Sequence, residues 1–470
     1  MDQAPALLWL RRELRLHDNA ALEAALRSGR PLLPVFILDE ITPGRWLPGG
    51  ATRWWLHHSL TALADDLRRR GAPLVLRRGR IAEELPRLVG ETGAAEVHAG
   101  LPSEPWARAA ISRLDLPLQL HRTTTLYPPG SIRTQQGGPY GVFTPFARAC
   151  RAQGAPPRAL PAPAHIAAAA APRSDRLEAW QLLPRDPDWA GGLRAAWQPG
   201  EHGARARLAQ FAGQALTTYD SSRNLPGIDG TARLSPALRF GEISPDEAWR
   251  AAAQAGDGTG VAAWQNELLW REFSAHLLWH HADLPELPLR RDYARMPWRS
   301  DPAALRAWQR GQTGIPIVDA GMRQLWQTGW MHNRVRMIVA SLLVKHLLLP
   351  WQDGAAWFWD TLVDADLASN SAQWQWVAGS GADAAPYFRI FNPVLQGRRF
   401  DPDGRYVRRF VPELARLPDH ALHAPWMAAP LELAEAGIVL GRSYPQPVVD
   451  LAAGRARALA ALAQISGRHG

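Results

Sequence analysis

Strand-like and helical segments alternate over the first 121 residues and then give way to helices. Apolar runs at 6–10 and 32–38 flank a helical stretch that Asp18 or Asn19 caps and that ends near Leu26. The alternation continues through 52–70, 73–76, 81–90, 95–99, 104–114 and 116–121. This pattern predicts a parallel sheet with helices on both faces. No Gly-x-Gly-x-x-Gly follows the first strand, so a classical NAD site is not predicted.

The composition changes to Ala and Pro, with Gly and Arg, between about 151 and 198. This change predicts an interdomain linker over the surface, with a short helix at Ala167–Pro172 as an alternative. From Ala204 onward the pattern is helical and broken by Gly and Pro turns. We therefore predict the fold class α/β plus all-α. Its parts are a Rossmann-like parallel α/β domain at 1–140, a long linker at 141–198 and an α-helical domain at 199–470.

The overall composition is typical of a soluble globular protein, with 46% hydrophobic and 21% charged residues. No apolar run reaches the roughly 18 residues that a membrane span needs, and the N-terminus does not resemble a secretory signal. Cys150 is the only cysteine, so no disulfide forms within the chain. These features predict a protein of a reducing, cytoplasmic compartment without a membrane partner.

The charge balance favours a polyanionic partner. There are 53 basic and 44 acidic side chains, a net charge of +9, and Lys345 is the only lysine. Arginine pairs bidentately with phosphate, which makes nucleic acid a candidate, although genome composition produces the same arginine excess. The 22 Trp outnumber the 11 Phe and 7 Tyr together, so several indoles are expected to do more than fill the core.

A late segment combines chemistry that is unusual in a core. Residues 364–376 hold two acids, an asparagine and two tryptophans, a mixture that predicts a pocket with an apolar body and a few polar points. A large planar ligand suits such a pocket. Just upstream, 329–337 opens an apolar run that is predicted to be helical to Leu349, with Asn333 and Met337 on one face. Asp364 and Asp366 lack accompanying His, Cys or Glu at ligand spacing, so no metal site is predicted.

Two other segments offer polar side chains. Residues 219–223 and 230–236 combine hydroxyls and arginines with a turn that opens a helix at Ser235 or Ser244, a mixture suited to a diphosphate. Plain helix caps are the alternative for these hydroxyls. Residues 264–273 form a helix that places Glu267, Trp270 and Arg271 on one face. A local Glu–Arg pair on a half-buried face is the alternative there.

Several long motifs occur in an order that resembles the photolyase/cryptochrome family, and specifically the class I cyclobutane pyrimidine dimer photolyases. They are LLWLRRELRLHDNAAL, TGWMHNRVRM, DADLASNSAQWQW, YFRIFNPVLQGRRFDPDGRYVRRFVPEL and YPQP. The resemblance implies an antenna function for the α/β domain and FAD binding by the helical domain. Ser103–Arg108 lies where some relatives contact a folate, but its residues depart from that pattern. Both the presence of an antenna and the choice between a folate and a deazaflavin type therefore stay open.

The resemblance also implies roles for single residues. The FAD positions are matched by Tyr219, Thr231, Ala232, Arg233, Leu234, Ser235, Trp264, Arg271, Asn333, Arg336, Asp364, Ala365, Asp366 and Asn370. Among these, Arg336 is expected to pair with Asp364, and Asn370 to face flavin N5. The lesion and DNA positions are matched by Glu267, Trp270, Met337, Trp376, Arg223, Arg334, Arg389 and Gln396. An electron-transfer chain is matched by Trp374, Trp351 and Trp298, in that order from the flavin to the surface.

The implied activity is that of a monomeric deoxyribodipyrimidine photo-lyase. In such an enzyme light-driven electron transfer from reduced FAD repairs cyclobutane pyrimidine dimers in DNA. A cryptochrome-like blue-light photosensor without repair is the alternative. Two features disfavour this alternative: there is no long tail beyond about 465, and all four lesion residues are present together, namely Glu267, Trp270, Met337 and Trp376. Repair of the (6-4) photoproduct is disfavoured because WMHNRVRM lacks the expected catalytic histidine. A flavin-dependent oxidoreductase is disfavoured because no nicotinamide site is found in the sequence.

Overall fold

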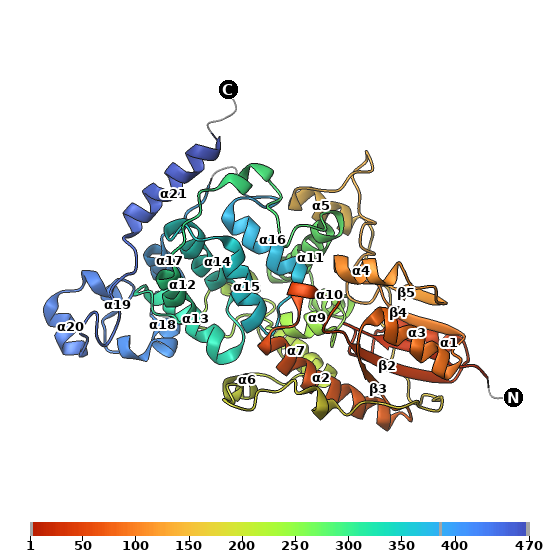
Figure 1. Ribbon diagram of the computed structural model, residues 1–470. Coiled ribbons are helices and arrows are strands. Elements are labelled where there is room, and N and C mark those ends of the chain that lie inside the picture. Colours follow the sequence, from red (N-terminus) through yellow and green to blue (C-terminus); the bar gives the residue numbers. More distant parts are fainter. Residues whose placement is uncertain (1–2, 385–387, 467–470) are drawn as a thin grey trace. The chain divides into compact units, whose positions relative to one another are not determined.

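The computed structural model describes residues 3–384 and 388–466 (Figure 1). These residues fold into two compact units. Unit 1 contains the chain up to Thr217 together with Ala232–Ala282 and Val363–Ala368. Unit 2 contains Thr218–Thr231, Asp283–Leu362 and the chain from Ser369 onward. Tyr387, which opens one of the family motifs, lies outside the described residues.

The predicted parallel sheet forms in unit 1. Its five strands have the order β3-β2-β1-β4-β5, and every neighbouring pair is parallel. The central strand pairs on both sides, with Ala6 opposite Leu32 of β2 and Glu96 of β4. The strands are β1 (Ala6–Leu10), β2 (Leu32–Leu38), β3 (Val75–Arg78), β4 (Glu96–Gly100) and β5 (Leu118–His121).

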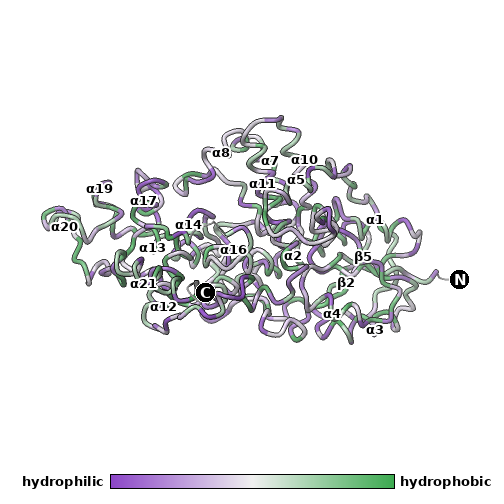
Figure 2. The backbone as a smooth tube through the Cα atoms, turned by 90° about the horizontal axis from the view of Figure 1, so that it is seen from above, coloured by the Kyte–Doolittle hydropathy of each residue, from purple (hydrophilic) through white to green (hydrophobic). Residues whose placement is uncertain are grey.

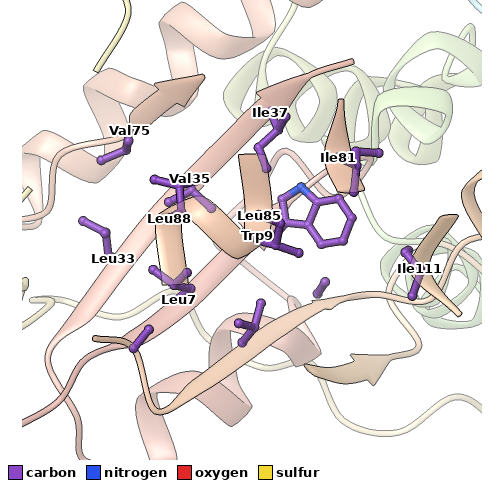
Figure 3. Packing of buried hydrophobic residues seen from close by; sticks show 13 residues of the cluster. Leu7, Trp9, Leu33, Val35, Ile37, Val75, Ile81, Leu85, Leu88 and Ile111 are labelled. Atoms are coloured by element: carbon purple, nitrogen blue, oxygen red, sulfur yellow. The ribbon is translucent and has the colours of Figure 1, made fainter. Parts of the chain in front are cut away.

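Helices cover the sheet because β1 and β2 are apolar on both faces. β1 and β2 are buried along their whole length. Leu7, Trp9 and Val35 point to one face, where they pack against Ile81 and Leu85 of α3 (Ile81–Thr92; Figure 3). The chain order reverses after β3, so right-handed crossovers place the later helices on the face opposite the earlier ones.

The helices of unit 1 begin and end close to the predicted positions in its first 121 residues. Asn19 is the N-cap of the first helix, and its side-chain oxygen accepts from the N–H groups of Ala21 and Leu22 at 3.1 and 3.2 Å. The α-helices of unit 1 are α1 (Ala20–Arg27), α2 (Gly50–Arg69), α3 (Ile81–Thr92), α4 (Pro105–Ile111), α5 (Phe143–Arg151), α6 (Gly191–Ala196), α7 (Glu201–Gln214), α9 (Ser235–Phe240), α10 (Pro245–Gln254) and α11 (Thr259–His280). Short 3-10 helices form at η1 (Gly44–Trp46) and η2 (Leu177–Trp180).

Part of the Ala/Pro segment is packed into unit 1. Ile166, Trp180 and Leu182 are buried, and Ala168 forms a parallel bridge with Leu32. Because its backbone bonds to β2, the Ala run at 167–172 does not form the short helix that was the alternative. The boundaries predicted for the linker and the two domains stay predictions.

Unit 2 is helical. Its elements are α8 (Tyr219–Ser222), η3 (Arg291–Arg295), α12 (Pro302–Gln309), α13 (Pro316–Thr328), α14 (Asn333–Ser341), η4 (Leu342–His346), α15 (Trp351–Thr361), α17 (Pro393–Phe400), α18 (Arg405–Phe410), η5 (Pro412–Leu414), α19 (Asp419–Leu422), η6 (Pro425–Met427), α20 (Pro430–Ala436) and α21 (Leu451–Ser466). The helix α16 (Leu367–Ala378) begins in unit 1 and continues in unit 2.

The helical run that was predicted to reach Leu349 ends at His346. The α-helix ends at Ser341, and a π-helical turn, η4, follows it. Within this turn Lys345 is buried, and its Nζ donates to the Ala378 carbonyl at 3.0 Å. Burial lowers the pKa of Lys345 well below its usual value. The wide turn and a left-handed Leu348, with φ of 55°, end the helical run early.

Hydrophilic positions recur along the tube in Figure 2. Within the described ranges, no helix is both long and apolar enough to cross a membrane. Over the same residues, no group of three or more His, Cys, Asp or Glu side chains is placed to hold a metal ion.

Candidate functional site

The acidic segment 363–368 is attached to unit 1 by two arginines. Arg12 Nη2 pairs with Asp366 Oδ2 at 2.6 Å, and Arg239 Nε donates to the Ala365 carbonyl at 2.5 Å. Asp364 is buried. The segment that resembles a flavin contact is therefore fixed in place by side chains from the end of β1 and from α9. The predicted pair between Arg336 and Asp364 joins residues of different units and stays a prediction.

Glu104, in the segment compared with a folate contact, is already engaged in ion pairs. Arg12 Nη1 lies 2.5 Å from Glu104 Oε1, and Arg11 Nη2 lies 3.8 Å from Glu104 Oε2. Burial alone would raise the pKa of Glu104, but the charges of Arg12, Arg11 and Arg239 lower it to about 2. The carboxylate is thus ionised and committed to arginines of the same unit.

The segment matched to the FAD phosphates has a strained backbone. Arg233 has a φ of 51°, in the left-handed region, and its guanidinium lies 4.9 Å from the centre of the Trp197 ring. Non-glycine residues in this region are uncommon and often mark functional sites. Leu234 is the N-cap of α9 and makes no side-chain capping bond, whereas Ser244 caps α10 by accepting from the Glu247 N–H at 2.8 Å. Both predicted helix starts are confirmed.

A cavity of about 240 Å³ adjoins this segment within unit 1. It has an aromatic wall, where Trp55 and Trp197 meet edge to face with centroids 5.5 Å apart. Glu242 also borders it and accepts a hydrogen bond from Trp55 Nε1 at 2.9 Å. The other lining residues are Ala196, Gln198, Gly203, Ala204, Ala206, Arg207, Gln210, Arg233, Leu234 and Ala237.

The helix α11 contains the predicted face of Glu267, Trp270 and Arg271. Trp270 stacks on Phe143, with centroids 3.6 Å apart and planes at 5°. One face of this indole is therefore covered by α5. Arg271 pairs with its neighbour Glu272 at 3.3 Å. On the same helix Trp264 is buried, with its ring 4.9 Å from that of Phe211.

Unit 2 has an arginine-lined cavity of about 390 Å³. Three of the predicted DNA residues line it together: Arg334, Arg389 and Gln396. Arg334 is held from two sides, because its Nη2 donates to Asn224 Oδ1 at 2.7 Å and its guanidinium lies 4.5 Å from the centre of the Phe400 ring. Phe391 and Arg399 complete the lining. The fourth predicted DNA residue, Arg223, lies 5.5 Å from the centre of the buried Tyr219 ring.

The start of α14 is capped by a neutral histidine. His332 Nδ1 accepts from the Arg334 N–H at 3.2 Å. Burial, followed by the charges of Arg334, Arg336 and Arg223, lowers the pKa of His332 to about 3. Arg336 Nε donates to the Met331 carbonyl at 2.8 Å. The start of α14 thus brings Arg334 and Arg336 near one uncharged imidazole, and Arg223, which follows α8 (Tyr219–Ser222), acts on it as well. Asn333 and Met337 share α14 as predicted.

The predicted tryptophans lie at different depths in unit 2. Trp374 and Trp351 are buried, and Trp298 is partly buried against the cluster of Tyr293 and Leu348. Burial therefore separates only Trp298 from the other two, and the order of electron transfer stays a prediction. Trp374 packs edge to face on Phe358 at 5.1 Å.

The two remaining predicted residues of α16 have restrained side chains. Asn370 Nδ2 donates to the Ala355 carbonyl at 3.0 Å. Trp376 Nε1 donates to the Asp383 carbonyl at 3.1 Å. Both bonds lie within unit 2.

Sequence reasoning assigned no role to Arg12, Asn224, Arg239, Arg399 and Phe400. Each contacts or borders a predicted residue in the structure. The available signal was a motif, since Arg12 lies within LLWLRRELRLHDNAAL and Asn224 follows Arg223. Their partners are distant in sequence, 354 positions for Arg12 and 110 for Asn224, so spacing alone does not reveal them.

Comparison with known proteins identifies the family. A model described as "FAD binding domain of DNA photolyase" matches residues 264–464, and one described as "DNA photolyase" matches 6–164. A deoxyribodipyrimidine photo-lyase of Agrobacterium fabrum is 46% identical, over 99% of both chains. Cryptochrome-1 of Arabidopsis thaliana is 35% identical over 98% of this chain and 70% of its own. The chain belongs to the photolyase/cryptochrome family, and FAD is its cofactor.

The fold comparison agrees. The crystal structure of a bacterial class III photolyase from Agrobacterium tumefaciens matches with a TM-score of 0.95 and 46% identity, over 99% of this chain and 98% of the other. A Synechocystis cryptochrome matches with a TM-score of 0.88 and 28% identity, over 98% and 100% of the two chains. The predicted fold class is confirmed. The resemblance to class I is not confirmed, because the structure that matches at 46% identity is that of a class III photolyase.

Proposed function

We propose that the protein is a deoxyribodipyrimidine photo-lyase that repairs cyclobutane pyrimidine dimers in DNA under blue or near-ultraviolet light. The observation that supports this most is the arginine-lined cavity of unit 2, where Arg334 is held by Asn224 and Phe400 beside Arg389 and Gln396. Preorganised guanidinium groups suit phosphate, and DNA affinity should come mainly from such contacts.

The residues matched to FAD offer the chemistry that this cofactor needs. Thr231, Ser235 and Arg233 supply hydroxyl and guanidinium donors for a diphosphate. Asp364, Asp366 and Asn370 supply acceptors and an amide for an isoalloxazine ring. The donor set therefore fits FAD. FAD, when bound, reduced and excited by light, supplies one electron to the dimer and takes it back after the ring opens.

The remaining residues have supporting roles in this proposal. Glu267 contacts the dimer and stabilises the charge that arrives on it, and Trp270 offers the ring face that Phe143 does not cover for stacking. Met337 and Trp376 complete the lesion contacts, while Arg223 contacts the DNA backbone. Trp374, Trp351 and Trp298 conduct electrons that reduce oxidised flavin in light. We further infer that the enzyme acts as a cytoplasmic monomer.

An oligonucleotide with a single thymine dimer tests the proposal. We expect intact thymines to be restored under blue light and not in darkness. Glu267→Ala should lower the repair yield per absorbed photon more than it lowers DNA affinity. The matched control is Gln265→Ala, on the same helix and outside the predicted face. No restoration in light would contradict the proposal, and equal losses of yield and affinity would make Glu267 a binding residue only.

The second candidate is a cryptochrome-like photosensor without repair. The similarity to a plant cryptochrome favours it, at 35% identity over nearly the whole chain. The same assay separates the two functions, because a photosensor would reduce its flavin in light and leave the dimer intact.

For an antenna chromophore we propose the cavity whose aromatic wall is formed by Trp55 and Trp197. Its aromatic wall suits a planar heterocycle of the folate or deazaflavin type. The carboxylate of Glu104, in the segment first compared with a folate contact, is held by Arg12 and Arg11 instead. Trp55→Ala, which leaves the contact between Trp197 and Arg233 in place, should remove any non-flavin near-ultraviolet or visible band from the purified protein and keep the flavin bands. A band that survives would place the antenna elsewhere.

A further inference from the structure

A buried ion cluster connects the end of β1, the start of α4 and the acidic segment of unit 1. Arg12 is its centre and pairs with Glu104 at 2.5 Å and with Asp366 at 2.6 Å. The exposed fractions of the Arg12, Glu104 and Asp366 side chains are 12, 7 and 16%. These pairs are therefore poorly screened by solvent, and their charges act strongly on one another.

The backbone around the cluster is bonded as well. Arg12 Nε donates to the Arg239 carbonyl at 3.2 Å, and Arg239 in turn donates to the Ala365 carbonyl. Both ends of the connection lie within unit 1. Arg12 thus holds the side chain of Asp366, and Arg239 holds the carbonyl of the preceding residue, Ala365. Two separate contacts therefore fix the position of the Asp366 carboxylate.

Further charges act on the cluster from neighbouring elements. Arg11 lies near Glu104, and the charges of Arg239 and Arg271 interact with that of Asp366. Burial lowers the pKa of Arg239 to about 10, and the charge of Arg12 contributes to this decrease. Arg12 itself stays protonated, because its two carboxylate partners raise its pKa despite burial.

We propose that Arg12 and Glu104 are positioning residues that act through Asp366 to set the charge experienced by the flavin. This inference rests on the proposed placement of Asp366 beside the isoalloxazine ring. Arg12 offsets the negative charge of Asp366, and Glu104 offsets part of the positive charge of Arg12. The loop after β1 thereby contributes to the redox state of the cofactor, although none of the residues matched to FAD lies in that loop.

The signs of the two effects are opposite. Reduction adds negative charge to a flavin, so a nearby cation favours the reduced form and a nearby anion opposes it. Loss of the Arg12 charge leaves Asp366 uncompensated and should lower the midpoint potential. Loss of the Glu104 charge leaves Arg12 more positive and should raise it. A merely structural role predicts no such opposition, because both substitutions break the same cluster.

Spectroelectrochemical titration of the purified FAD-loaded protein tests this. We expect Arg12→Gln to shift the potential downward, and Glu104→Gln and Asp366→Asn to shift it upward. Arg12→Lys keeps the charge and should stay near the wild type. Arg122→Gln is the matched control, because Arg122 pairs with Asp246 at 2.6 Å in the same unit and contacts no residue of the cluster.

The outcomes separate this inference from the proposed site. Shifts in the same direction for Arg12→Gln and Glu104→Gln, or an Arg12→Lys shift as large as that of Arg12→Gln, would overturn it. If only Asp366→Asn changes the potential, Asp366 remains beside the flavin and the roles of Arg12 and Glu104 are wrong. If none of the three changes it, the placement of Asp366 fails and the inference fails with it.

Discussion

At Arg334 a fixed guanidinium predicts a specific salt dependence. Its bonds to Asn224 and its contact with Phe400 reduce the entropy lost when it binds a phosphate. Arg334→Gln should weaken DNA binding and reduce the slope of log affinity against log salt by about 1. Asn224→Ala keeps the charge, so affinity should fall with the slope unchanged. Binding titrations at several salt concentrations measure both, and an unchanged slope for Arg334→Gln would refute the phosphate contact.

The proposed electron-transfer chain depends on the indole of Trp374. Trp374 is buried between Phe358 and Trp308, and a phenyl ring in its place is far harder to oxidise. Trp374→Phe should therefore abolish photoreduction of oxidised flavin, followed as bleaching of its visible absorption. Trp180→Phe replaces a buried indole of unit 1 and is the control. Normal bleaching in Trp374→Phe would exclude the proposed electron-transfer chain through Trp374.

Glu242 makes stability depend on pH. Burial raises its pKa from 4.5 to about 7, although Trp55, Ser59 and the Gly200 N–H donate to its Oε1. Because the folded-state pKa is raised, the stabilising contribution is complete below pH 4.5 and is lost as the pH rises through about 7. Glu242→Gln keeps an acceptor but does not titrate. Between pH 4.5 and about 7, the unfolding free energy of this variant should therefore fall by about 3 kcal/mol less than the unfolding free energy of the wild type. Chemical denaturation at several pH values measures the difference, and parallel profiles would contradict it.

At the scale of elements, the contact between α15 and α16 depends on a glycine. A Cβ added at Gly354 of α15 would lie 2.1 Å from Cη2 of Trp374. Gly354→Ala should destabilise the protein by about 1–3 kcal/mol and slow photoreduction, because the indole must move. Gly213→Ala, in α7, meets nothing within 4 Å and should be neutral or stabilising. Thermal denaturation of both variants checks this, and a stable Gly354→Ala with normal photoreduction would show that the contact tolerates a methyl group.

The elements were predictable where local pattern decides them. The strand at 32–38 and the helix after Asn19 form as predicted, because apolar runs and caps are local signals. The end of α14 was not predictable from local pattern, because the π-helical turn that follows it contains a buried lysine, Lys345, whose hydrogen-bond partner Ala378 is 33 residues away. The site shows the same limit. The chemistry of residues 364–376 predicts a pocket, which stays a prediction, and nothing local indicates that Arg12 pairs with Asp366.

At the scale of the whole molecule, the family resemblance gave the cofactor and the fold, and the structure adds the groups that hold the predicted residues. The net charge of +9 and the arginine-lined cavity agree with a polyanionic substrate. The comparisons place the chain among both photolyases and cryptochromes. Light-driven repair by bound FAD is therefore the central claim to test.

The wavelength dependence of repair tests that claim most directly. Repair of a single thymine dimer, measured per incident photon across the near-ultraviolet and visible range, should follow the absorption spectrum of the reduced flavin in the same preparation, with any antenna band added. Repair that proceeds in darkness, or that is absent at the wavelengths where the reduced flavin absorbs, would contradict the account.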